Sequence, residues 1–156
     1  MINFIRLANL SGLLNVQKHT LREWIKVLEP LSSRKVKERS ASEFNTTDLF
    51  FFKIVKILNN DIGIKIELIS NFSKELYSII NNINSIEEDR TIWIFKTGGR
   101  VWKISDEPKS GVLCFSIPLG KISMEISSSL GVIDVRKHPL VKPDKNKNNL
   151  FVYKNN

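Results

Sequence analysis

The sequence predicts an α+β protein, with a helical N-terminal half followed by a small antiparallel β-sheet. In the first half, apolar residues recur at three- and four-residue steps, the spacing of one face of a helix. From Thr91 onward, β-branched and aromatic residues flank the pair Gly98-Gly99, a pattern typical of a β-hairpin. The 156 residues can form one domain or two small ones, and we expect two, residues 1–86 and 87–156.

Residues 10–24 are predicted to form two short helices joined by a tight turn. The first helix has an apolar seam at helical spacing, made of Leu10, Leu13 and Leu14. Ser11 is small enough to allow the second helix to cross closely. Asn15 tolerates the left-handed conformation of a tight turn, and Val16 can fill the corner between the helices. Leu21 and Ile25 continue the seam on the second helix.

The outward side of the second helix carries side chains that can donate hydrogen bonds: Gln17, Lys18, His19, Thr20 and Arg22. They lie at the N-terminal end of the helix, where the backbone amides and the helix dipole favour phosphate. This is the layout of a helix-turn-helix that binds in the major groove of DNA. An ordinary helical hairpin with a solvated face is the alternative.

A basic segment follows the second helix, which Pro30 is expected to end. Residues 32–40 contain four basic residues against one acidic residue, and the basic ones are Arg34, Lys35, Lys37 and Arg39. We expect an exposed hairpin, or wing, that contacts the phosphate backbone beside the groove. A solvated loop without a partner is the alternative.

Two further helices are predicted between residues 46 and 86. The hydroxyls of Thr46 and Thr47 can cap the third helix, and Asp48 places a carboxylate in its first turn. One side of this helix is apolar (Phe51, Ile54, Val55, Leu58) and the other is polar (Lys53, Lys56, Asn60). The turn 61–63 leads into the fourth helix, whose apolar residues have coiled-coil spacing: Ile69, Phe72, Leu76, Ile79, Ile83 and Ile86. This stripe predicts either homodimer contacts or packing onto the protein's own second half.

The order of helix-turn-helix, basic wing and two helices resembles the DNA-binding domain of MerR-type winged-helix regulators. The resemblance covers about residues 5 to 83, with residues 62–69 opening the last helix. It implies that Gln17, Lys18, His19, Thr20 and Arg22 lie on the recognition helix, and that Arg34, Lys35, Lys37 and Arg39 lie in the wing. It also implies pairing through the helix that follows. The chain departs from the family in having no Arg before the aromatic Phe44 that closes the wing.

The second half is expected to form about four strands. The Gly98-Gly99 turn, with both glycines at positive φ, would pair Phe95 with Trp102 and Trp93 with Ile104. A second hairpin would join residues 112–117 to residues 121–127, and residues 127–137 fit either a helix or a strand. The aromatic residues of this sheet, which also include Phe115, form its core or line a pocket for a small-molecule or protein effector.

Composition favours a polyanionic partner, because the formal net charge is +8 and the pI is about 9.7. No apolar run approaches the roughly 20 residues that span a bilayer, and no signal peptide is recognisable, so we expect a cytoplasmic protein without membrane contacts. The single Cys114 and the two histidines, His19 and His138, do not have the spacing of a metal site, and we expect no cofactor. Catalytic motifs are also absent from the sequence, so an enzyme is not expected.

These features together predict a sequence-specific regulator of transcription that binds double-stranded DNA. An architectural, excisionase-like DNA-binding factor uses the same winged fold and is the first alternative. A winged-helix adaptor that binds another protein, for example a phage packaging component, is the second.

Overall fold

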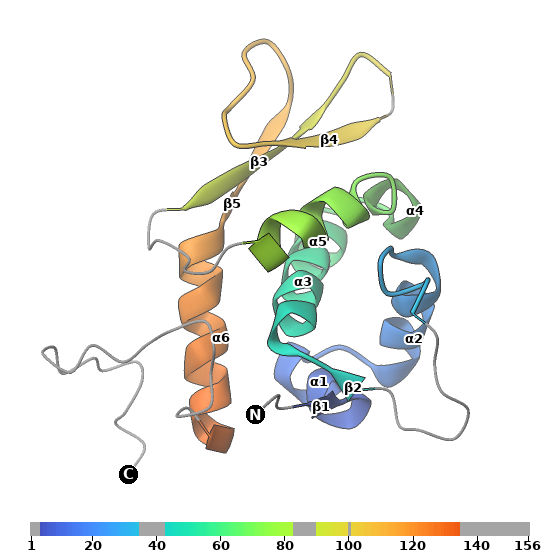
Figure 1. The fold of residues 1–156 in the computed structure, drawn as a ribbon. Coiled ribbons are helices and arrows are strands. Elements are labelled where there is room, and N and C mark those ends of the chain that lie inside the picture. The colour runs from blue at the N-terminus through green and yellow to red at the C-terminus, as the bar shows by residue number, and fades with distance from the viewer. Residues whose placement is uncertain (1–3, 35–42, 83–89, 100, 135–156) are drawn as a thin grey trace, which may run out of the picture.

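The computed structural model describes residues 4–34, 43–82, 90–99 and 101–134. Its elements follow in the order β1 (Ile5–Arg6), α1 (Leu7–Leu14), α2 (Lys18–Val27), β2 (Glu43–Phe44), α3 (Thr46–Lys56), the π-helical turn η1 (Ile57–Asp61), α4 (Ile66–Ile69), α5 (Ser73–Asn82), β3 (Thr91–Lys96), β4 (Trp102–Ser105), β5 (Cys114–Pro118) and α6 (Leu119–Asp134). The larger sheet lies at one end of the helices (Figure 1). The predicted α+β class is confirmed.

Helix α3 is the centre of the fold, and α1, α5 and α6 all pack against it. Its consecutive residues Phe50, Phe51 and Phe52 are all fully buried, so the helix is covered on almost every side. The predicted amphipathic helix with one polar stripe is therefore only half right. Lys53 and Lys56 are half-buried, and each contacts a neighbouring helix.

The cap of α3 differs from the prediction. Asn45, and not a threonine hydroxyl, is the N-cap residue, and its side chain accepts a hydrogen bond from the Asp48 N–H at 2.9 Å. The Asp48 carboxylate in turn accepts from the Asn45 N–H at 2.9 Å. The two bonds form a capping box, which satisfies two backbone donors at once and fixes where the helix starts.

The apolar core is one continuous cluster that includes residues from both halves of the chain. Ile92 and Ile94 of β3, and Ile122 and Ile126 of α6, belong to the same cluster as the phenylalanines of α3. The predicted domain boundary between residues 86 and 87 falls in residues 83–89, outside the described part of the chain.

The predicted fourth helix is divided into α4 and α5, after a turn in which Gly63 has a φ of 86°. This changes the role of the stripe predicted to form a dimer. Ile69, Phe72 and Leu76 are at most 3 % exposed and lie in the chain's own core, so they offer no free surface to a second copy. Ile79 packs against that core, while Ile83 and Ile86 lie outside the described residues.

Two antiparallel sheets are present in the described residues. In the smaller one, Ile5 of β1 pairs with Phe44 of β2. The larger has the order β4-β3-β5, so it has three strands and not the expected four. The predicted strand at residues 121–127 is wrong, because these residues belong to α6. The apolar spacing from Ile122 to Ile126 fits either periodicity, but with Leu119 and Leu130 included it follows a helical repeat.

The predicted register of the β3-β4 hairpin is wrong by one residue. Trp102 pairs with Lys96, and Ile104 pairs with Ile94. The connection is longer than a two-residue turn, because the Thr97 N–H donates to the Val101 carbonyl at 3.0 Å. Neither Gly98 nor Gly99 adopts the left-handed conformation expected of that turn.

The shifted register separates the sheet's aromatic residues onto two faces. Trp102 lies on the buried face with Ile94 and Ile104, whereas Trp93 and Phe95 lie on the opposite face and are half-buried. The predicted single aromatic face of Trp93, Phe95 and Trp102 is therefore not formed.

Candidate nucleic-acid interface

The turn between α1 and α2 is tight, as the sequence predicts. Asn15 is left-handed, with φ 51° and ψ 48°. Its N–H donates to the Gly12 carbonyl at 3.2 Å, and the Val16 N–H donates to the Ser11 carbonyl at 3.1 Å. The Ser11 hydroxyl donates back to the Val16 carbonyl at 2.6 Å, and the Val16 side chain is buried at the corner. The predicted left-handed Asn15 and the predicted burial of Val16 at the corner are confirmed.

The inner side of α2 is fixed to the protein core. Leu21 is fully buried and Trp24 is 3 % exposed, and the Trp24 ring stacks on Phe52 of α3 with centroids 6.4 Å apart. The Lys56 ammonium donates to the Leu14 carbonyl at the end of α1, at 2.8 Å. These contacts hold both helices of the motif against α3, so the outer side of α2 has a fixed orientation.

The predicted contact residues lie together at the N-terminal end of α2. Gln17, Lys18, His19 and Arg22 are exposed, and Thr20 is half-buried. Gln17 is the N-cap, and its side chain makes no capping hydrogen bond, so the first-turn amides have no side-chain acceptor there. The end of the helix therefore combines positive side chains with unsatisfied backbone donors, a combination that suits an anionic partner.

The same helix carries one acidic residue. Glu23 is exposed, and the Lys26 ammonium donates to its carboxylate at 2.8 Å. That hydrogen bond and the charge of Lys26 lower the pKa of Glu23. Because Lys26 balances it, the carboxylate opposes an approaching polyanion less than a free one would.

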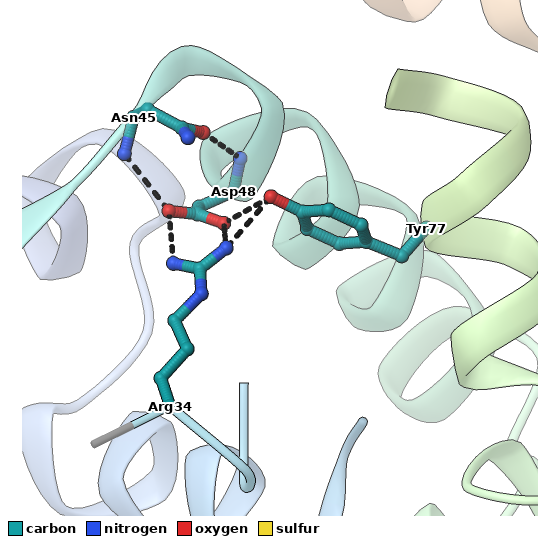
Figure 2. Close-up of polar contacts among 4 residues, drawn as sticks. All are labelled: Arg34, Asn45, Asp48 and Tyr77. Atoms are coloured by element: carbon teal, nitrogen blue, oxygen red, sulfur yellow. Dashed lines mark hydrogen bonds and ion pairs between the residues drawn. The ribbon is translucent and has the colours of Figure 1, made fainter. Parts of the chain in front are cut away.

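Arg34 was predicted to contact phosphate, but it is held inside a polar network at the start of α3 (Figure 2). Its guanidinium makes a bidentate contact with Asp48, at 2.8 Å from Nη1 to Oδ2 and 2.6 Å from Nη2 to Oδ1. It also donates to the Tyr77 hydroxyl at 2.7 Å, and that hydroxyl donates to Asp48 at 2.8 Å. This corrects the prediction, because a guanidinium already paired with a carboxylate is not a free phosphate ligand.

Burial and neighbouring charges shift the pKa values of Arg34 and Tyr77 in the network. Asp48 is fully buried, whereas the Arg34 side chain is 38 % exposed. The hydrogen bond to Asp48 raises the pKa of Arg34, which keeps the guanidinium charged. Burial, followed by the negative charge of Asp48, raises the pKa of Tyr77 to about 12. Tyr77 is therefore a neutral donor at physiological pH.

The network and the small sheet hold the described residues on either side of positions 35–42. Arg34 is held by Asp48 before these positions, and the pairing of β1 with β2 holds residues 43–44 after them. Lys35, Lys37 and Arg39 themselves lie outside the described residues. The three-residue spacing from Asn45 to Asp48 is that of a capping box, so the sequence could have predicted this part of the network. The participation of Tyr77 could not be predicted from neighbouring residues, because Tyr77 belongs to α5.

Comparison of the sequence with protein-family models and with curated protein sequences gives no match. Two negative findings apply to the described residues. None of the helices there is both long and apolar enough to cross a membrane. Histidine, cysteine and carboxylate side chains there do not gather in groups of three that could hold a metal ion.

Proposed function

We propose that the protein binds duplex DNA by placing the exposed side of α2 in the major groove, and that it regulates transcription in this way. The observation that carries the proposal is the N-terminal end of α2. There, Lys18, His19 and Arg22 are exposed on a helix whose other side is fixed to the core through Leu21 and Trp24. A rigidly supported helix with outward donors is what reading base edges requires.

Two exposed side chains of α2, Arg22 and Lys18, have distinct roles in this proposal. Arg22 is one turn into the helix, and a guanidinium can form two parallel hydrogen bonds with the edge of a guanine. Lys18 is the first helical residue, where its charge adds to that of the helix end and favours a phosphate. The segment with Lys35, Lys37 and Arg39 would contact the neighbouring backbone, since both of its ends are anchored beside the motif.

The test begins with selection of bound duplexes from a random pool, which defines a preferred site. Arg22→Ala should then weaken binding to that site by about 1–3 kcal/mol and relax the preference at one position. Lys18→Ala should weaken all duplexes alike and reduce the slope of log affinity against log salt by about one. Lys103→Ala is the matched control, because Lys103 is an exposed lysine on β4, in the other half of the chain.

If both α2 variants bind duplexes as tightly as the wild type, the proposal is wrong. Selection of phased, repeated sites together with strong bending would identify an architectural factor. Failure to bind any duplex at moderate salt would favour the protein-interaction adaptor.

A further inference from the structure

The structure contains a second basic feature, a cleft between the helical part and the sheet. It has a volume of about 340 Å³ and is lined on one side by the turn that precedes α4 and on the other by the end of the sheet. This volume lies in the range of small-molecule sites, which is about 300–1,000 Å³. We propose that this cleft binds a small aromatic anion, such as a carboxylate on one or two fused rings.

The charges in the cleft favour an anion. Lys65, from the turn, and Lys96, from the end of β3, both line it, and none of its described lining residues is acidic. Both lysines are exposed, and neither forms an ion pair with another described residue. Two lysines that line one cleft both attract a carboxylate, and hydrogen bonds between charged groups are about twice as strong as neutral ones.

The remaining walls favour a flat ring. Trp102 and Phe115 lie on the sheet side, with ring centroids 5.7 Å apart and planes tilted by 32°. Leu113, which is 59 % exposed, and Leu68 of α4 add apolar surface. Aromatic walls bind a ligand ring through offset or edge contacts, so they discriminate in favour of planar groups.

The observed strand register places a lysine and two aromatic rings on the same face of the sheet. Because Lys96 pairs with Trp102, the two side chains lie on one face, and the Lys96 ammonium lies 6.0 Å from the centre of the indole ring. Pairing of Ile94 with Phe115 puts the second ring on the same face. The buried face of the sheet thus ends in two rings beside a cation: Trp102, which belongs to the core cluster, and Phe115, which packs against it.

The experiment is isothermal titration calorimetry of the full chain with 2-naphthoate, using neutral 2-naphthamide as the matched ligand. We expect naphthoate to bind at least about tenfold more tightly than the amide, because only the former pairs with both lysines. The double variant Lys65→Gln/Lys96→Gln should lose that preference, and Lys103→Gln, on the opposite face of the sheet, should keep it. In NMR spectra, the indole N–H of Trp102 should shift more than those of Trp24 and Trp93.

In calorimetry, the proposal is wrong if naphthoate does not bind at millimolar concentration or binds no more tightly than naphthamide. It is also wrong if the double variant still prefers naphthoate over naphthamide. In NMR spectra, a shift confined to the indole N–H of Trp24 or Trp93 would overturn it as well. Urea midpoints equal to that of the wild type would show that the variants are folded. The measurement contains no DNA, so its outcome is independent of the proposed DNA binding.

Discussion

Substitution of Arg34 tests whether its guanidinium serves to neutralise the buried Asp48 rather than to contact DNA. Asp48 is fully buried and accepts four hydrogen bonds, two of them from Arg34. Arg34→Ala leaves the carboxylate with only the Asn45 N–H and the Tyr77 hydroxyl as donors. The substitution therefore creates a buried negative charge without its positive partner.

The size of the effect follows from the burial of the two partners. Removing one member of a fully buried ion pair costs about 3–5 kcal/mol of unfolding free energy. Because the Arg34 side chain is 38 % exposed, water can enter the vacated position, and we expect a smaller loss, about 2–3 kcal/mol. In Arg34→Ala/Asp48→Asn the stranded charge is gone. The double variant should therefore be more stable than the sum of the single effects predicts, by at least about 1 kcal/mol.

The free energies of unfolding are measured by urea denaturation of the wild type, the two single variants and the double variant. The comparison requires that the four m-values agree. Lys26→Ala is the control, since the Lys26–Glu23 pair is exposed and should contribute little to stability. A loss for Arg34→Ala no greater than that for Lys26→Ala would refute the reasoning. So would a salt dependence of duplex binding that falls by a full unit in Arg34→Ala, because that result would place the guanidinium on phosphate.

Two further predictions concern Tyr77 and Asn15. The pKa of Tyr77 is raised from 10.0 to about 12, so the folded protein keeps a proton that the unfolded chain loses, and stability should fall between about pH 10 and pH 12 by up to roughly 1.4 kcal/mol per pH unit. Tyr77→Phe should lack this part of the decline when unfolding is measured across that range, and identical slopes in the two proteins would contradict the assignment. At Asn15, whose φ is 51°, the β-branched substitution Asn15→Val should cost about 1–2 kcal/mol in urea unfolding, whereas Asn15→Gly should be neutral or slightly stabilising. Equal effects of the two substitutions would show that backbone conformation does not decide stability at this turn.

The helix-turn-helix could be predicted from the sequence because its determinants are local. Asparagine is one of the few residue types that readily adopt the left-handed conformation, and Asn15 does so. The apolar residues of α1 just before it have the spacing of one face of a helix. Ser11 and Val16 are five positions apart and meet across the same turn. When the interacting residues lie within one or two turns of the chain, spacing alone identifies the partners.

Features that depend on distant segments could not be predicted in the same way. The partner of Arg34 is 14 positions away, and Tyr77 is 43 positions away, so their meeting depends on the packing of α3 and α5. The stripe from Ile69 to Leu76 has the spacing of a coiled coil, but these residues are buried in the chain's own core, where α5 packs against α3 and α4 against α2 and η1. The same apolar spacing serves an interface or a core, and only the rest of the fold determines which.

The corrected role of Arg34 changes how the basic segment should be understood. The charge of Arg34 is balanced by Asp48 within the protein, and the pair holds the chain just before residue 35. Pairing of Arg6 with Glu43 in the small sheet fixes where the segment returns. Lys35, Lys37 and Arg39 are then the residues through which it would act on phosphate, with Arg34 as their support.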